Sequence, residues 1–255
     1  MDKLIFSLCP HDAVRNLPAW IELELHLRQR AGCPYPAQYF TDFESFYKQG
    51  FPRLGAGYLN PLDLLAAVDE RGFTPLARAP FPEAVVAITA ADHPSQEQDL
   101  NGATWAIVPR QFASYLGLYV GQQRGLKPGR VVLAESWLQV VRWVAEGRVP
   151  YGLVYKGVYE HLSALSRENV QVIGEAEVDF AWHGFVLTGQ APPELRDRCQ
   201  TVLLNMHHDP QGRTILDRLG MERWLPIDQL DRLREAVNQG RAALQALLDQ
   251  TPGAR

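Results

Sequence analysis

Short apolar runs alternate with amphipathic segments along most of the chain, and this alternation predicts its secondary structure. Apolar runs that end at Gly, Pro or Asn are typical of buried strands. The strands predicted in this way span residues 3–9, 38–40, 54–59, 73–79, 84–89, 104–108, 131–133, 151–155, 170–174 and 182–188.

Segments with apolar residues three or four positions apart predict the helices. A helix over 17–30 should end at Gly32, and Thr41 should cap a helix over 42–49, with Glu44 completing a capping box. Asn60 and Pro61 should open a helix that runs through Val68. The remaining predicted helices span 112–123, 137–145, 158–165, 193–208, 211–219 and 229–248. Strands and helices that alternate in this way predict a mostly parallel α/β sheet.

Length and composition narrow the class of protein. A chain of 255 residues can form one large domain or two small ones, and 46% hydrophobic with 21% charged residues is ordinary for a globular protein. A net charge of −4 gives no support for nucleic-acid binding. The longest apolar run, 84–91, is far shorter than the ~20 residues that cross a bilayer.

The first residues, MDKLIFSLCPHD, do not read as a secretory signal, because the apolar part is short and no small-residue cleavage site follows. We therefore expect a cytoplasmic protein, or a periplasmic one if a signal has been removed and replaced by Met1. Cys9, Cys33 and Cys199 are an odd number without CxxC spacing, which predicts neither a disulfide framework nor a zinc site. Free thiols and a single Cys9–Cys33 disulfide both stay open.

Motifs that mark enzymes are missing from the sequence. It contains no GxSxG, HExxH, Walker loop or complete GxGxxG. Adjacent His207 and His208 on a helix would point about 100° apart, so they predict the end of a surface helix rather than a metal site. We expect no catalytic residues, no cofactor and no bound metal.

The order of segments between residues 131 and 228 is the most specific signal in the chain. VVLAESWLQVVRWVAEGRVPYGLVY is followed by VQVIGEAEVDFAWHGFVLTG and by PPELRDRCQTVLLNMHHDPQGRTILDRLGMERWLPID. This order resembles the second lobe and return crossover of type II periplasmic solute-binding proteins, above all the phosphonate/phosphite-binding family of ABC transporters. The resemblance covers nearly the whole chain. It implies an α/β fold of two lobes with a hinge and an interlobe cleft.

Domain boundaries and function also follow from the resemblance. Lobe one would comprise 1–91 and 178–255 and lobe two 92–177, with crossings near 87–93 and 174–180. The protein would close over a small molecule and deliver it to an ABC permease or report it to a sensor protein. The alternative is a cytoplasmic ligand sensor or accessory protein that has kept the fold without the transport role. An enzyme on this fold would need a nucleophile or an acid–base pair, and the sequence offers neither.

Residues that follow the predicted strands are the candidate ligand contacts, because ligands of open α/β sheets bind at the carboxyl ends of strands. Taken singly, each is more simply explained by capping or packing; the resemblance places all of them around one cleft. The candidates are His11, Tyr39, Tyr58, Asn60, Arg110, Gln111, Phe112, Ser114, Glu135, Ser136, Trp137, Tyr155, Trp182 and His183.

The turn at residues 110–114 predicts the ligand class. The phosphonate-binding family usually has Ser-Thr-Ser-Gly there, and this chain has Arg110-Gln111-Phe112-Ala113-Ser114. The family also tends to carry a histidine where Ser136 and Trp137 stand. We therefore expect no tight phosphonate binding. Arg110 should instead bind the carboxylate of a small organic ligand, or the aromatic rings should stack on a cation. A packed aromatic core without ligand preference is the remaining alternative.

Overall fold

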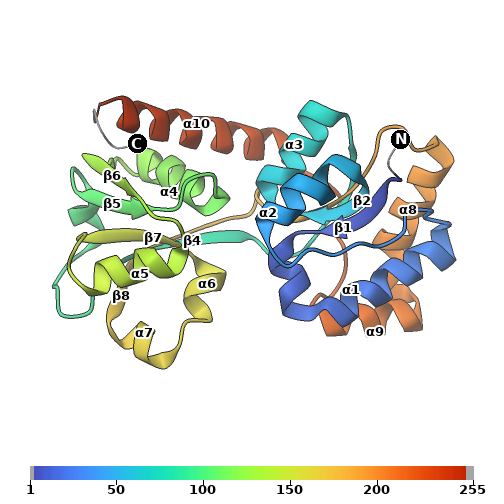
Figure 1. Cartoon of the computed structure of the whole chain (residues 1–255), viewed down its shortest axis with the longest axis horizontal. Coiled ribbons are helices and arrows are strands. Elements are labelled where there is room, and N and C mark those ends of the chain that lie inside the picture. Colours follow the sequence, from blue (N-terminus) through green and yellow to red (C-terminus); the bar gives the residue numbers. More distant parts are fainter. Residues whose placement is uncertain (1–2, 251–255) are drawn as a thin grey trace. The chain divides into compact units, whose positions relative to one another are not determined.

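The computed structural model describes residues 3–250, which divide into two compact α/β units (Figure 1). The first unit contains the chain through Phe81 together with Trp182–Gln229. The second contains Pro82–Ala181 together with the chain from Leu230 onward. The chain therefore passes from one unit to the other three times.

A four-stranded sheet forms the centre of the first unit. Its strand order is β1-β2-β9-β3, with β1 and β2 parallel and β9 antiparallel to both of its neighbours. The strands are β1 (Ile5–Leu8), β2 (Leu54–Leu59), β3 (Thr74–Arg78) and β9 (Gly184–Leu187).

Helices cover both faces of this first sheet (Figure 1). On one face α1 (Pro10–Ala31) packs against α8 (Pro193–Asn205) and α9 (Pro210–Leu219). Helix α3 (Pro61–Arg71) packs on the other face. Successive side chains of a strand point to opposite faces of the sheet. Those on this face, such as Phe6 and Leu8, pack in one hydrophobic core with side chains of α1, α8 and α9. The short helical segments are α2 (Phe43–Ser45), a π-helical turn at Phe46–Gly50, and 3₁₀ turns at Phe51–Arg53 and Met206–His208.

The second unit is built on a five-stranded sheet of order β6-β5-β7-β4-β8. Strand β4 is antiparallel to β7 and β8, whereas β5 is parallel to β6 and β7. The strands are β4 (Glu83–Ala90), β5 (Thr104–Ile107), β6 (Arg130–Leu133), β7 (Tyr151–Tyr155) and β8 (Val170–Val178).

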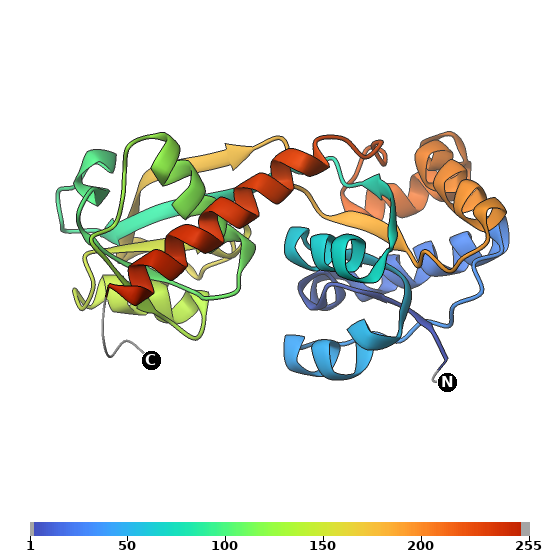
Figure 2. The same cartoon turned by 90° about the horizontal axis from the view of Figure 1, so that it is seen from above.

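Successive residues of β7 show how the helices of the second unit are placed. Gly152 faces α5 (Trp137–Ala145), since a β-carbon at this position would clash with Val140. The next residue, Leu153, contacts Gly117 of α4 (Phe112–Gln123). The two helices therefore lie on opposite faces of the sheet. Helix α10 (Leu230–Asp249) packs on α4, as Figure 2 shows for the red and green ribbons. The shorter helices are α6 (Lys156–Glu160), α7 (Ala164–Glu168) and a 3₁₀ turn at Glu97–Leu100.

The alternation of strands and helices predicted from the sequence is confirmed, with local corrections. Residues 38–40 form no strand; the neighbouring Ala37 makes a single bridge to Phe6. Asp42, not Thr41, caps the next helix, because its carboxylate accepts from Ser45 N–H at 2.7 Å. The helix predicted over 158–165 is two helices, since Ser163 caps a new one.

The strand directions refine the prediction of a mostly parallel sheet. Each sheet contains one reversed strand, β9 in the first and β4 in the second. Each of these is the first strand after the chain has entered its unit, at Trp182 and at Pro82. Strands that are connected by helices within one unit run parallel to each other.

The unit boundaries differ from those expected at 91/92 and 177/178. The expected crossing at 87–93 falls partly in β4, whose full length pairs with β8. The C-terminal helix also belongs to the second unit, because the apolar side of α10 is buried against α4. Among residues 3–250, no helix combines the length and apolarity that a membrane span needs.

Candidate functional site

Polar side chains that lie directly before or after strands come together at one edge of the first sheet. Strand β1 ends before Cys9, β2 ends before Asn60, and β9 begins after His183. Leu8 pairs with Tyr58, and Leu59 pairs with Gly184, so the three strand ends are neighbours. The N–H of Cys9 donates to Tyr58 O at 2.8 Å, which ties the start of α1 to β2.

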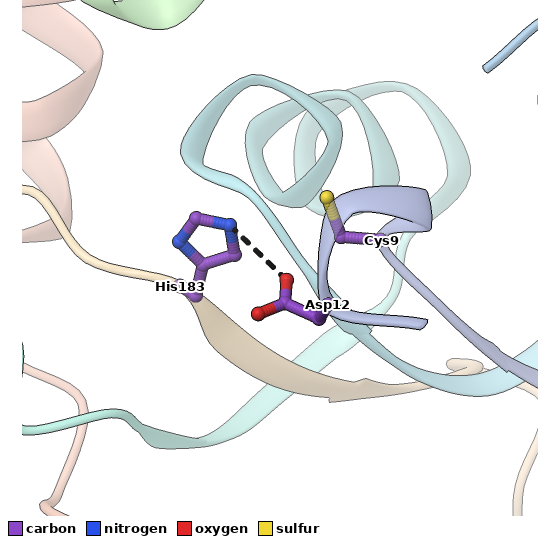
Figure 3. Close-up of side chains that lie close together, drawn as sticks. All are labelled: Cys9, Asp12 and His183. Atoms are coloured by element: carbon purple, nitrogen blue, oxygen red, sulfur yellow. Dashed lines mark ion pairs between the residues drawn. The ribbon is translucent and has the colours of Figure 1, made fainter. Parts of the chain in front are cut away.

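Cys9, Asp12 and His183 form a compact cluster at this edge (Figure 3). One ligand atom from each lies within 4.8 Å of the other two. His183 Nε2 is 3.6 Å from Asp12 Oδ2, an ion pair when the imidazole is protonated. The Cys9 side chain is buried, and the side chains of His183 and Asp12 are 15% and 21% exposed. The cluster therefore combines a thiol, a carboxylate and an imidazole beside each other.

A second set of hydrogen bonds adjoins the cluster at the start of α3. Asn60 Oδ1 accepts from Leu62 N–H and Asp63 N–H, and this caps the helix. Asn60 Nδ2 donates to Asp63 Oδ2 at 2.6 Å and lies 3.9 Å from Cys9 Sγ. Tyr47 Oη donates to the same carboxylate oxygen at 3.4 Å. Asn60 thus connects the buried Asp63 to Cys9.

Aromatic rings hold His183 in place. Its ring stacks on Tyr58 at 5.3 Å between centroids, with 28° between the planes. Tyr58 in turn packs against Trp20 at 4.5 Å and edge-on to Trp224 at 5.7 Å. Tyr58 and both tryptophans are buried. The orientation of the imidazole is therefore fixed by core packing.

Burial perturbs two acidic groups at this edge. Removal from water raises the pKa of Asp63 to about 6, although the hydrogen bonds from Tyr47 and Asn60 act in the opposite direction. Burial also raises the pKa of the Cys9 thiol, an effect that neighbouring His183 partly offsets. Perturbed groups that cluster at a strand-end edge are typical of functional sites.

Other residues predicted for the site from this unit have different surroundings. His11 is exposed, with its ring edge-on to Phe43 at 4.8 Å. Tyr39 packs against the core beside Phe6, and burial raises the pKa of its hydroxyl. Trp182, another predicted ligand contact, is fully buried. The large apolar ring of Trp182 is stabilised by removal from water more than a polar strand-end residue would be.

In the second unit, Arg110 is exposed and adopts the left-handed conformation, with φ 57°. It precedes α4, whose N-cap residue Gln111 makes no capping hydrogen bond through its side chain within residues 3–250. Phe112 is buried. Ser114 is also buried, and its Oγ donates to Val108 O at 2.7 Å. The hydroxyl group expected to bind a ligand at this turn therefore donates its proton to the backbone.

The next turns of the second unit are also largely structural. Ser136 caps α5 by accepting from Gln139 N–H at 3.2 Å. Glu135 is exposed, and Trp137 is buried. Tyr155 is half-buried where β7 meets α6. Among these four predicted contacts, the exposed ones are therefore Glu135 and Ser136.

The cysteines and the paired histidines have simple surroundings. All three cysteines are free thiols, so the Cys9–Cys33 disulfide is not formed. Cys33 is hydrogen-bonded to Cys199 instead, across the core of the first unit. The rings of His207 and His208 lie 3.8 Å apart in the 3₁₀ turn that follows α8.

Sequence reasoning missed Cys9 and Asp63, and it did not bring Asp12 together with Cys9. It placed the start of the first long helix at residue 17, where the structure has a break in α1 at Asn16. With α1 starting at Pro10, Cys9 and Asp12 are three positions apart at a helix start and share a face. The signal available was Pro10 itself, a residue that favours the first helical position.

Comparisons with solved structures support the fold. XAC2383 from Xanthomonas citri bound to ATP is 15% identical, with a TM-score of 0.70 over 96% of this chain and 99% of that chain. PhnD1 from Prochlorococcus marinus in complex with methylphosphonate is 14% identical, with a TM-score of 0.66 over 92% and 98%. A binding protein component of an ABC phosphonate transporter from Pseudomonas aeruginosa is 16% identical, with a TM-score of 0.66 over 98% and 96%. No curated protein matches the sequence.

A family model places the chain more specifically. The model described as ABC transporter, phosphonate, periplasmic substrate-binding protein matches residues 6–231, which include both sheets and all the strand-end turns described above. The order of segments that resembled this family in the sequence is therefore confirmed. The chain belongs to the phosphonate-binding family of periplasmic substrate-binding proteins of ABC transporters.

Proposed function

We propose that this protein binds a small organic molecule through a carboxylate, supplies it to an ABC transporter, and does not bind phosphonate or phosphate tightly. The start of α4 is the observation that carries the proposal. Arg110 is exposed there, and the side chain of Gln111 does not cap the helix within the described residues. Helix N-terminal amides favour an anion, and a guanidinium binds the two oxygens of a carboxylate side by side.

The same turn is a poor match for a phosphonate group. A tetrahedral dianion has three oxygens that need donors, and each buried oxygen without a donor costs about 1–3 kcal/mol. Ser114 already donates its hydroxyl proton to Val108 O, and Phe112 and Ala113 bring no side-chain donor. A planar carboxylate needs fewer donors than this dianion.

The first unit also disfavours a dianion. Its strand-end edge carries the carboxyl groups of Asp12 and Asp63. The side-chain oxygen of Asn60 already accepts hydrogen bonds from two backbone N–H groups at the start of α3. A phosphonate dianion placed there would be repelled by both carboxylates when they are ionised. The anion-binding character of the protein is therefore assigned to Arg110 and α4.

Calorimetry and thermal shift on the full chain test the proposal. Small carboxylates should stabilise the protein, whereas phosphate, phosphite, methylphosphonate and 2-aminoethylphosphonate should not. For a carboxylate that binds, Arg110→Ala should weaken binding by about 1.5–3 kcal/mol, the range for a hydrogen bond to a charged group.

Arg130→Ala is the matched control, because Arg130 is another exposed arginine of the second unit. It should leave carboxylate binding unchanged. Submicromolar binding of any of the four phosphorus compounds would contradict the proposed specificity. Equal affinity of wild type and Arg110→Ala would contradict the role of Arg110.

A further inference from the structure

We propose that Cys9, Asp12 and His183 form a binding site for a divalent transition-metal ion of the zinc type. The site lies in the first unit and shares no residue with the turn at Arg110. It therefore goes beyond the proposed solute specificity, and either proposal can fail without the other.

The separations among the three side chains suit one shared ion. Zinc binds sulfur at about 2.3 Å and imidazole nitrogen or carboxylate oxygen at about 2.0–2.2 Å, so two ligand atoms on one tetrahedral ion lie roughly 3.3–3.7 Å apart. His183 Nε2 and Asp12 Oδ2 are 3.6 Å apart. All three ligand atoms lie within 4.8 Å of one another, so small rotations of side chains bring the sulfur into range.

The scaffold supplies the candidate ligands from two directions. Cys9 is the N-cap residue of α1, and Asp12 is in the first turn of that helix. His183 comes from the other side, immediately before β9, where its ring is stacked on Tyr58. Asn60 Nδ2, 3.9 Å from Cys9 Sγ, supplies an outer contact to the sulfur. Outer contacts of this kind orient metal ligands.

A metal also accounts for the burial of the thiol better than a nucleophilic role does. Cys9 is fully buried, whereas reactive cysteines are partly exposed. A divalent ion replaces the thiol proton on binding, so the negative sulfur becomes paired rather than isolated.

The surface exposure of the cluster gives the ion a route in. The side chains of Asp12 and His183 are partly exposed, so the metal ion enters from their side. Cys9 is buried and lies at the inner end of the site. Three protein ligands leave a fourth coordination position of a tetrahedral ion for water or another small ligand. Sulfur and imidazole select zinc or cobalt over magnesium and calcium, which prefer oxygen ligands.

The test uses the full chain, purified with its thiols reduced and stripped of metal. Calorimetry should show one equivalent of Zn²⁺ or Co²⁺ bound, with proton release, and no comparable binding of Mg²⁺ or Ca²⁺. The Co²⁺ complex should show a sulfur-to-metal charge-transfer band. Cys9→Ala should abolish that band, and Asp12→Asn and His183→Gln should each weaken binding by more than about 10–100-fold, the range for loss of outer contacts.

His207→Gln/His208→Gln is the control, because these adjacent histidines belong to the first unit but lie in a different turn, after α8. This double variant should keep both the affinity and the band. Circular dichroism checks that Cys9→Ala is folded, and the partly exposed His183 gives an independent variant if it is not. Absence of stoichiometric Zn²⁺ binding, unchanged binding in His183→Gln, or loss of binding in the histidine control would each overturn the proposal.

Discussion

The helix-opening turns of the two units follow the same plan but differ in their chemistry. In the first unit, Cys9, Asp12 and His183 converge within 4.8 Å, next to the buried carboxyl group of Asp63. In the second unit, Ser114 and Ser136 bind the backbone, and Arg110 is exposed. One edge thus concentrates mutually close polar groups, whereas at the other Arg110 is exposed before a helix whose N-cap side chain makes no capping bond within residues 3–250.

This difference shows that position at a strand end does not by itself define a functional residue. A strand-end side chain can stabilise its own turn, as Ser136 does, or remain available to a ligand, as Arg110 does. Its hydrogen-bond partners decide which of these applies, because a committed donor is not available to a ligand.

The largest expected effects come from one buried tryptophan in each unit. Trp105→Ala and Trp224→Ala should each lower the free energy of unfolding by about 3–5 kcal/mol, through lost burial and a cavity. Trp224 contacts Tyr58, which orients His183, so Zn²⁺ affinity should fall in Trp224→Ala only. Denaturant unfolding and calorimetry on both variants measure this. Equal loss of Zn²⁺ affinity in both variants would contradict the assignment of the metal site to the first unit.

The next largest effect is the pH dependence caused by Asp63. Its pKa is about 6 in the folded chain against an ordinary 3.8, so the folded state binds the extra proton between these values. Relative to Asp63→Asn, the wild type should lose up to about 3 kcal/mol of stability as pH rises from about 4 to about 6. Urea unfolding across this range measures the difference.

Glu135→Gln supplies the contrast from the second unit. Glu135 is exposed at its strand end, so the substitution should change stability by less than about 0.5 kcal/mol. A pH-independent difference between wild type and Asp63→Asn would show that the carboxyl group of Asp63 is not buried in solution.

A smaller difference should separate the two helix caps. Ser136→Ala removes one capping bond and should cost about 1 kcal/mol. Asn60→Ala removes two capping bonds and the donor to Asp63, and should cost about 2 kcal/mol or more. Thermal unfolding of the two variants compares them. A larger cost at Ser136 would show that the start of α3 is held by packing alone.

The smallest effect concerns left-handed backbone. Arg110 has φ 57°, and Gly72, which ends α3, has φ 66°. Arg110→Gly should stabilise the folded chain by about 0.5 kcal/mol, because relief of strain exceeds the added entropy of glycine when unfolded. Gly72→Ala should cost about 1 kcal/mol for the opposite reason. Differential scanning calorimetry detects both, and destabilisation in Arg110→Gly would indicate that the arginine side chain makes stabilising contacts.

Much of the fold was predictable from local pattern. Helices α4 and α5 and strands β2 and β7 have the bounds expected from the sequence, because each combines a clear period with a start or stop signal. The prediction failed for residues 38–40, where pairing with β1 is limited to a single bridge at the neighbouring Ala37. Whether such a run pairs depends on its neighbours in space.

The candidate site was predictable only in part. Asn60 and His183 follow from their places beside strands; His183 belongs to the cluster at the first sheet edge, and Asn60 adjoins it. Cys9 and its proximity to Asp12 were missed, because the two residues share a face only if α1 starts at Pro10. Trp182, also expected at the ligand site, is fully buried, and burial of its large ring is favourable.

By itself, the sequence determined the kinds and order of the elements and, through the order of segments from 131 to 228, the family. Tertiary structure alone decided that α10 joins the second unit and that residues 9, 12 and 183 meet. Periodicity and capping act over a few residues and can be read along the chain. Pairing of β2 with β9 joins segments more than 120 residues apart, and only the packed sheet specifies which side chains share its edge.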